Sequence, residues 1–210
     1  MMFKDRTDAG QQLSVLLSQY RGQPNVVVFG LARGGVAVAY EVAKSLGCPL
    51  DVICTRKIGA PSNPEFALGA ITESGEGYFD FNTINQLNVS KKYLEETIAS
   101  EKAVAAHRYA IFTGGRPKND VTGKIVLLVD DGLATGATMK AAIQSVKKKN
   151  VQKIVVAVPV SPKETLTEIE SLADHVVCLQ TPASFYAVGQ FYEDFGQVEE
   201  GEVLAFLKKS

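Results

Sequence analysis

One stretch, residues 125–138, constrains the fold more than any other part of the chain. It reads IVLLVDDGLATGAT, so five apolar residues end abruptly at Asp130 and Asp131, and a turn of small residues follows. A short apolar run of this kind is typical of a buried parallel strand, and apolar residues at helical spacing follow from Met139. The sequence therefore predicts a strand, a loop and a helix. The two carboxylates fall at the carboxyl end of the strand, where open α/β sheets bind their ligands.

The polar groups of this loop suit a ligand that carries both a sugar and a phosphate. Each carboxylate can accept hydrogen bonds from the hydroxyls of a sugar ring. Residues 135–138, TGAT, add two hydroxyls and unobstructed backbone N–H groups at a helix N-terminus, where the helix dipole favours a phosphate. A buried strand that ends in solvated Asp residues would explain the apolar run but not the whole string.

A similar pattern of strand and loop occurs near the start of the chain. The β-branched run 26–29 breaks into GLARGG before another helical pattern, and the run 50–54 is followed by Arg56 and Lys57. The glycines are not spaced as in the dinucleotide or P-loop fingerprints, which argues against a nucleotide-binding reductase. They permit close backbone approach beside one cation, Arg33. The two later cations could neutralise a pyrophosphate or merely solvate a strand end, and we favour the pyrophosphate.

The string VLLVDDGLATGAT resembles the phosphoribosyl pyrophosphate (PRPP) signature of the type I phosphoribosyltransferases: an apolar strand, two acidic residues, a short linker and T-G-x-T. The resemblance, which covers roughly residues 26–179, implies a member of that family with an uncharacterised acceptor. It implies that Asp130 and Asp131 position the ribose and act in catalysis, with Mg²⁺ bound through PRPP beside them. The residues implied for the ribose and 5′-phosphate are Asp130, Asp131, Gly132, Leu133, Ala134, Thr135, Gly136, Ala137 and Thr138. Those implied for the pyrophosphate are Ala32, Arg33, Gly34, Arg56 and Lys57.

The alternation of strands and helices, with further apolar runs at 154–158 and 176–179, predicts an α/β fold with an open parallel sheet and helices on both faces. We expect residues 1–210 to form a single phosphoribosyltransferase domain. A flexible lid loop is expected at about 58–72, since most of this segment is rich in Gly and Pro and lacks periodicity. Glu65, the one carboxylate in it, is a candidate for proton transfer.

A small hood is expected to choose the acceptor. One candidate segment is about 73–120. It continues from a predicted hairpin of residues 69–72 with 78–81 and includes a long helix capped by Ser90. The other is about 180–200, where five aromatic residues lie close together without strand or helix spacing. Phe185 and Tyr186 of this second segment are the candidates for contact with a planar acceptor.

The function that the resemblance implies is transfer of the 5-phosphoribosyl group of Mg-PRPP to a nitrogen acceptor, with release of pyrophosphate. The acceptor would be a nucleobase or a related compound of nucleotide metabolism. Family members that act on 6-oxopurines are similar here but place an Asp before the T-G pair, where this chain has Ala134. A 6-oxopurine acceptor is therefore disfavoured. The alternative is a regulatory protein on the same fold that senses PRPP without turnover.

Composition and the N-terminal sequence limit the partners and the cellular location that we expect. Lys and Arg number 22 against 23 Asp and Glu, so no basic field favours a nucleic-acid partner. Three cysteines without a Cys-x-x-Cys motif favour reduced thiols in the cytoplasm. No apolar run has the length of a membrane span, and the N-terminus lacks the apolar segment of a secretory signal. The charged residues 4–6 could be functional, but we favour their interpretation as a solvated lead-in to a helix capped by Asp8. Relatives of this fold are often homodimers, so a second copy is an expected partner.

Overall fold

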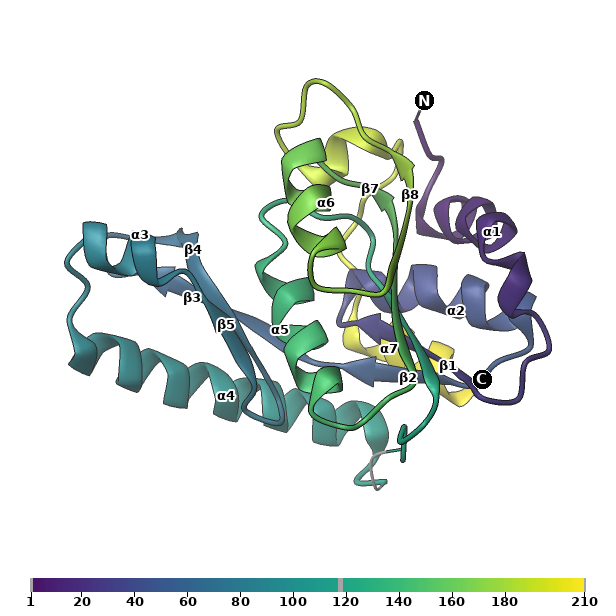
Figure 1. Cartoon of the computed structure of the whole chain (residues 1–210), viewed down its shortest axis with the longest axis horizontal. Helices are drawn as coiled ribbons and strands as arrows, with labels where there is room; N and C mark the ends of the chain where they lie inside the picture. The colour runs from purple at the N-terminus through teal and green to yellow at the C-terminus, as the bar shows by residue number, and fades with distance from the viewer. Residues whose placement is uncertain (1, 117–118, 210) are drawn as a thin grey trace.

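The centre of the molecule is a five-stranded parallel sheet with the strand order β2-β1-β6-β7-β8 (Figure 1). The computed structural model describes residues 2–116 and 119–209. The strands of this sheet are β1 (Val26–Leu31), β2 (Leu50–Ile53), β6 (Ile125–Val129), β7 (Lys153–Val160) and β8 (His175–Gln180). They coincide with the five apolar runs of the sequence, so the predicted open parallel sheet is confirmed.

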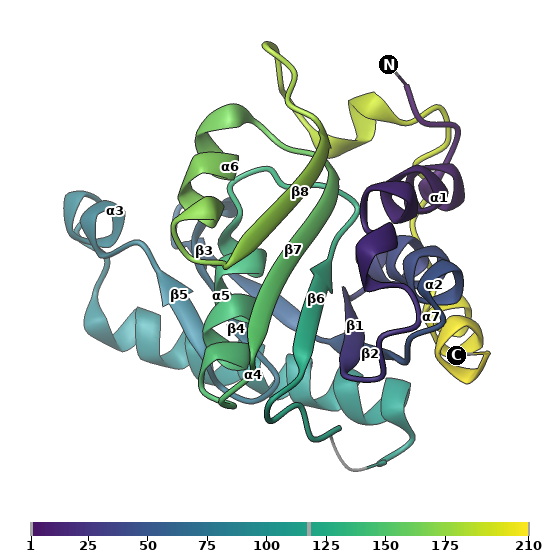
Figure 2. The ribbon, with the colours of Figure 1, turned by 45° about the vertical axis from the view of Figure 1, so that its right-hand side comes forward.

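The apolar runs are continuous because helices cover both faces of the sheet. In β6, Ile125, Leu127 and Val129 belong to one hydrophobic cluster, whereas Val126 and Leu128 belong to another. The first face is covered by α1 (Arg6–Leu16), α2 (Gly34–Leu46) and α7 (Glu200–Lys208), and the second by α5 (Ala137–Lys147) and α6 (Lys163–Glu170), as Figure 2 shows. We call this sheet and these five helices the body.

A second unit, which we call the arm, projects from the body on the side of α5 (Figure 1). Its antiparallel sheet has the order β3-β4-β5. The arm consists of β3 (Thr55–Ala60), β4 (Asn63–Thr72), β5 (Gly77–Phe79), α3 (Phe81–Gln86) and α4 (Lys91–Thr113). Ser90 caps α4 as predicted, since its hydroxyl accepts a hydrogen bond from the backbone N–H of Tyr93 at 3.2 Å. Residues 117 and 118 of the predicted hood segment lie outside the described residues.

The prediction of an irregular loop over residues 58–68 is wrong, whereas the predicted hairpin of residues 69–72 with 78–81 agrees with the pairing of β4 with β5. Residues 58–68 belong to the β3 and β4 pair, which is antiparallel and turns at residues 61 and 62. The pairing contains register shifts on both sides of Gly59, and a Cβ atom added there would overlap the backbone of Pro64. Such a bulge places an extra residue in one strand and breaks the alternation from which strands are predicted.

The N-terminal helix begins earlier than the sequence predicts. Asp5, not Asp8, is the N-cap of α1, because the Asp5 carboxylate accepts a hydrogen bond from the backbone N–H of Asp8 at 2.8 Å. Arg6 therefore occupies the first turn of the helix. Before the helix, the N–H of Phe3 donates to the Phe191 carbonyl at 2.8 Å, so the N-terminus lies along the segment that follows β8.

Two short 3₁₀ helices complete the description, η1 (Ser18–Tyr20) and η2 (Val188–Phe191). Among residues 2–116 and 119–209, none of the helices combines the length and the apolar character that crossing a membrane would require.

Candidate functional site

The predicted site lies where the carboxyl ends of β1 and β6 meet. These strands are neighbours in the sheet, with Gly30 opposite Val129. The next strand after β1 lies on one side of this pair and the next after β6 on the other, and such a reversal is where open α/β sheets bind ligands. The loop after β1 therefore lies beside Asp130 and Asp131, which we call the acid pair.

Two glycines allow the loop after β1 to approach the acid pair. A Cβ atom added to Gly34 would overlap Asp131 Oδ2, and one added to Gly35 would lie 2.7 Å from Asp130 Oδ1. Neither space admits a side chain. The peptide bond between Ala32 and Arg33, just before these glycines, is cis. The sequence predicts a ligand-binding role for both loops, but only the fold brings them into contact.

The loop after β6 encloses a cavity of about 340 Å³ at the N-terminus of α5. Gly136 is the N-cap of α5 with a φ of 70°, a left-handed conformation that favours glycine, and no side chain caps the helix. The first backbone N–H groups of α5 thus remain for a ligand. The cavity is lined by Arg6, Lys57, Asp130, Asp131, Gly132, Leu133, Ala134, Thr135, Gly136, Thr138, Val188 and Phe195. Of the residues predicted for ribose and 5′-phosphate, only Ala137 does not line it.

The acid pair is held by hydrogen bonds from two directions. Asp130 Oδ1 accepts from the Asp131 backbone N–H at 2.9 Å, and Asp131 Oδ2 accepts from Arg6 Nε at 2.8 Å. Burial, followed by the negative charge of Asp131, raises the pKa of Asp130 well above its usual range. Burial also raises the pKa of Asp131, while the Arg6 guanidinium opposes that shift. These two hydrogen bonds engage one oxygen of each carboxylate.

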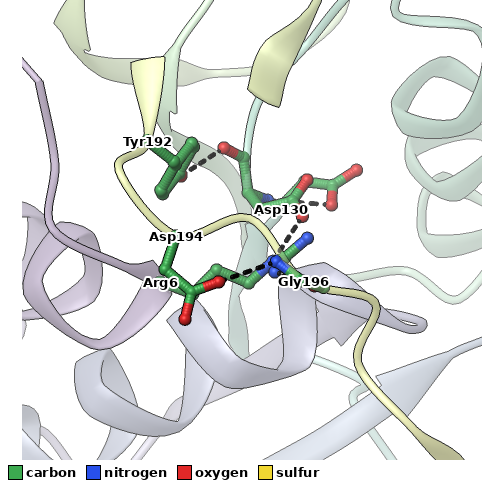
Figure 3. A network of polar contacts seen from close by, with 6 residues as sticks. Arg6, Asp130, Tyr192, Asp194 and Gly196 are labelled. Carbon is green, nitrogen blue, oxygen red and sulfur yellow. Dashed lines mark hydrogen bonds and ion pairs between the residues drawn. The ribbon is translucent and has the colours of Figure 1, made fainter. Parts of the chain in front are cut away.

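Arg6 is a site residue that the sequence analysis missed, because its interpretation as a solvated lead-in is wrong. The Arg6 side chain is only 12% exposed and lies against the acid pair (Figure 3). Its Nη1 donates to the Gly196 carbonyl at 2.8 Å, and its guanidinium lies 3.9 Å from the centre of the Phe195 ring. Nothing in the local sequence signals these contacts, because Asp131 is 125 residues away.

A second cavity, of about 550 Å³, adjoins the first and shares Lys57 and Thr138 with it. It is lined by Ala32, Arg33, Thr55, Arg56, Lys57, Gly59, Pro64, Glu65, Tyr93, Thr97, Glu101, Arg108 and Thr138. Four cations face this space. Arg108, which lies near the end of α4, lines the same cavity as Arg33, although no sequence pattern predicts this. We call this space the cationic cavity.

Carboxylates outside the predicted set hold the arginines of the cationic cavity. Arg56 Nε donates to Glu101 Oε2 of α4 at 2.6 Å. Arg33 and Arg108 lie 3.9 Å and 3.7 Å from carboxylate oxygens of Glu199 and Glu200, respectively, where α7 begins. The exposed side chain of Lys57 belongs to β3, so both the body and the arm supply cations to this cavity.

Three other predicted residues lie away from the acid pair. Glu65 is exposed on β4 and lines the cationic cavity, not the cavity at the acid pair. Phe185 packs on Phe191 with 5.3 Å between ring centres, and Tyr186 is 90% exposed. From the segment that follows β8, Val188 and Phe195 are the side chains that line the cavity at the acid pair.

Comparison with known proteins links this geometry to one family. The model of the phosphoribosyl transferase domain matches residues 4–195. A protein of Mycobacterium tuberculosis H37Rv, named "Putative phosphoribosyl transferase Rv0571c", is 44% identical over 209 residues, which are 100% of this chain and 47% of that protein. The chain thus spans about half the length of the curated relatives it matches.

The solved structures show the same fold. That of TT1426 from Thermus thermophilus is similar with a TM-score of 0.83 and 44% identity, over 100% of this chain and 99% of that one. The AQ2163 protein from Aquifex aeolicus has a TM-score of 0.50 and 12% identity, over 83% of this chain and 73% of that one, and it shows likeness in fold alone.

Proposed function

Because this chain belongs to the phosphoribosyl transferase domain family, we propose that it binds Mg-PRPP and transfers its 5-phosphoribosyl group to a nitrogen acceptor, releasing pyrophosphate. The observation that carries this proposal is the contiguity of the two cavities. One joins the acid pair to an uncapped helix N-terminus, and the other gathers four cations. A sugar with a 5′-phosphate on one side and a pyrophosphate on the other matches that order.

The ribose would lie on the acid pair. Each carboxylate has a second oxygen beyond the one that its hydrogen bond within the protein engages, so two acceptors face two vicinal hydroxyls. As the bond to pyrophosphate breaks, positive charge develops on the sugar ring. The negative charge of Asp130 and Asp131 would stabilise that charge in a site that is largely shielded from water.

The departing pyrophosphate would be held in the cationic cavity by Arg33, Arg56 and Lys57. Arg108, which lines the same cavity, would contribute a further positive charge. Magnesium fits the donor groups, because carboxylates and ligand phosphates supply the oxygen ligands that it usually selects. Among residues 2–116 and 119–209, no three metal-ligating side chains form a cluster, so the phosphates of PRPP would supply ligands as well. Bound Mg²⁺ would offset the negative charge of the pyrophosphate. The β3 and β4 hairpin would act as the lid that limits access of water.

The acceptor would enter between the acid pair and the segment after β8, which we propose as part of the hood, with Val188 and Phe195 beside it. Ala134 presents no carboxylate to the acceptor, which again disfavours a 6-oxopurine. Its carbonyl is engaged by the Thr165 hydroxyl at 2.7 Å. The roles of Glu65, Phe185 and Tyr186 remain predictions, as do a homodimer, cytoplasmic location and a single domain over residues 1–210.

The test is calorimetric titration of PRPP, with and without Mg²⁺, into the protein and into a variant with Asp130→Asn and Asp131→Asn. Asp120→Asn is the matched control, because this exposed residue lies near the opposite, amino end of β6. We expect saturable binding in the protein and the control, and its loss in the double variant. No binding in any of the three would contradict the proposal.

A screen of nitrogenous bases for pyrophosphate release would then separate transferase from sensor. Release with one class of base supports turnover, whereas tight binding of PRPP without release from any base would support the regulatory alternative.

A further inference from the structure

Arg6 joins three segments that are far apart in the sequence. Its Nε donates to Asp131 of the acid pair, and its Nη1 donates to the carbonyl of Gly196 (Figure 3). Its guanidinium also lies over the Phe195 ring. A Cβ atom added to Gly34 would also lie 3.0 Å from Arg6 Nε. The loop after β1, the acid pair and the segment after β8 therefore all pack against one side chain.

The arrangement fixes Asp131 from both ends of the residue. Its carboxylate is bonded to Arg6, and its backbone carbonyl accepts from the Tyr192 hydroxyl at 2.6 Å. Tyr192 in turn packs on Phe195, with 4.9 Å between ring centres. The donors that hold Asp131 thus come from the N-terminus and from residues 191–197, which we call the hood strap.

The hood strap is tied to the N-terminus by its backbone as well. The Glu193 N–H donates to the Phe3 carbonyl at 2.8 Å, and the Asp194 N–H donates to the Lys4 carbonyl at 2.9 Å. These bonds align the strap with the residues that lead into α1. Arg6 then extends from the first turn of α1 across the strap to the acid pair.

The Arg6 and Asp131 pair is poorly suited to a purely stabilising role. Their side chains are 12% and 15% exposed, and desolvation of two charges offsets most of the attraction between them. An aliphatic pair of similar volume would fill the same space at lower cost. What the ion pair provides instead is a defined orientation of the carboxylate, because Arg6 engages Oδ2 of a residue that lines the cavity.

We propose that Arg6 is a positioning residue that couples the hood strap to the ribose site. It orients Asp131 for the sugar and sets the strap against the same carboxylate, so order in one requires order in the other. This inference rests on the proposed function, since it assigns a role within the PRPP site. It differs from that function in naming a residue outside both ligand-binding loops.

The proposal separates two ligands that the variant Arg6→Gln should treat differently. Pyrophosphate alone would occupy the cationic cavity, which Arg6 does not line, whereas PRPP also needs the oriented Asp131. We expect Arg6→Gln to raise the Kd of Mg-PRPP about tenfold or more and that of Mg-pyrophosphate less than about twofold. Arg6→Lys, which keeps the charge but cannot donate in two directions with the same geometry, should fall between.

Two comparisons make the outcome decisive. Arg21→Gln is the control, because the Arg21 side chain donates only to the surface residue Ser45 among the described hydrogen bonds. Equal affinity of Arg6→Gln and the wild type for PRPP would overturn the inference, and so would equal losses for PRPP and pyrophosphate, which would indicate a general loosening of the fold.

Hydrogen exchange on the protein without ligand provides a reading that does not depend on PRPP. In Arg6→Gln we expect amides of the hood strap and of residues 130–136 to exchange faster together, while amides of β7 stay unchanged. Unchanged exchange in either segment would overturn the coupling. If the wild type does not bind PRPP at all, the proposed function fails, and the exchange result still decides whether Arg6 links the two segments.

Discussion

The body and the arm differ in how fully their strands are buried, although both supply groups to the candidate site. Every residue of β1 and β6 is buried, and the clusters on the two faces of the parallel sheet extend through its five strands, the five helices of the body and the end of α4. In the arm, the first four residues of β4 are exposed, and the cluster that only arm residues form is small, with Ala60, Leu68 and Ile84 buried.

The two units are joined at two places. Ala105 and Phe112, near the end of α4, are buried in the same cluster as α2 and α7. Ala70 of β4 packs on Ala137 and Ala141 of α5, with Tyr78 beside them. The acid pair is thus held by the well-packed body, whereas Arg56 and Lys57 extend from the less buried arm. The comparison places the acid pair at the end of a fully buried strand, whereas Arg56 and Lys57 lie on a hairpin whose outer residues are exposed.

Truncating one fully buried leucine in each unit would test whether the body and the arm differ in stability. Leu128→Ala in the body should lower the free energy of unfolding by about 2–5 kcal/mol, because the residues packed around β6 cannot fill the cavity that the truncated side chain leaves. Leu68→Ala in the arm should instead open the arm locally with little change in the global transition. Urea unfolding followed by circular dichroism, with native-state hydrogen exchange, measures both. If Leu68→Ala lowers global stability as much as Leu128→Ala, arm and body unfold as one unit.

The loops after β1 and β6 lie so close together that one added methyl group should weaken the binding of Mg-PRPP. Gly34→Ala places a Cβ atom onto Asp131 Oδ2, and such overpacking costs about 1–3 kcal/mol, or roughly 5- to 150-fold in affinity for Mg-PRPP. Gly201→Ala is the control, because nothing lies within 4 Å of its added Cβ and alanine favours the helix α7. Calorimetry compares the two, and an unaltered Kd in Gly34→Ala would argue against a site at this contact.

A cation of the arm should matter less than the acid pair of the body. Lys57 is exposed and lines both cavities, so Lys57→Gln removes about 1 kcal/mol of attraction, or roughly fivefold in Kd, for Mg-pyrophosphate and Mg-PRPP alike. Lys57→Arg should restore most of the affinity, and Lys208→Gln on α7 should change nothing. A loss for PRPP alone would place Lys57 at the sugar instead of the pyrophosphate.

The smallest expected effect concerns the outer end of the arm. Hydrogen bonds from the Thr83 hydroxyl and then from its backbone N–H lower the pKa of Asp80, the N-cap of α3, below the usual 3.8. Because the folded pKa lies below the unfolded one, the stabilisation is present above about pH 4 and is lost as the pH falls through the folded pKa. Titration of the Thr83 amide by NMR should give a midpoint below 3.8. In Asp80→Asn the cap should remain and this titration should vanish.

The sequence by itself determined the body and the content of its ligand-binding loops. Each strand of the parallel sheet is a short apolar run, and residues 130–138 indicate the acid pair and the helix N-terminus because all of their groups are adjacent in the chain. The arm was harder to predict. Its helix α4 has a recognisable Ser90 cap, but the bulge at Gly59 removes the alternation that would have identified β3 and β4 as strands.

The tertiary structure alone decided which distant residues complete the site. Arg6 begins α1, where the charged local sequence is typical of solvated residues. Arg108 lies near the end of α4, where interaction with the helix dipole would by itself account for a cation. Their contacts with Asp131 and with the cationic cavity span long stretches of the chain, so no spacing or periodicity encodes them. They arise because the parallel sheet brings the carboxyl ends of β1 and β6 together, and because the hood strap folds back along the N-terminus.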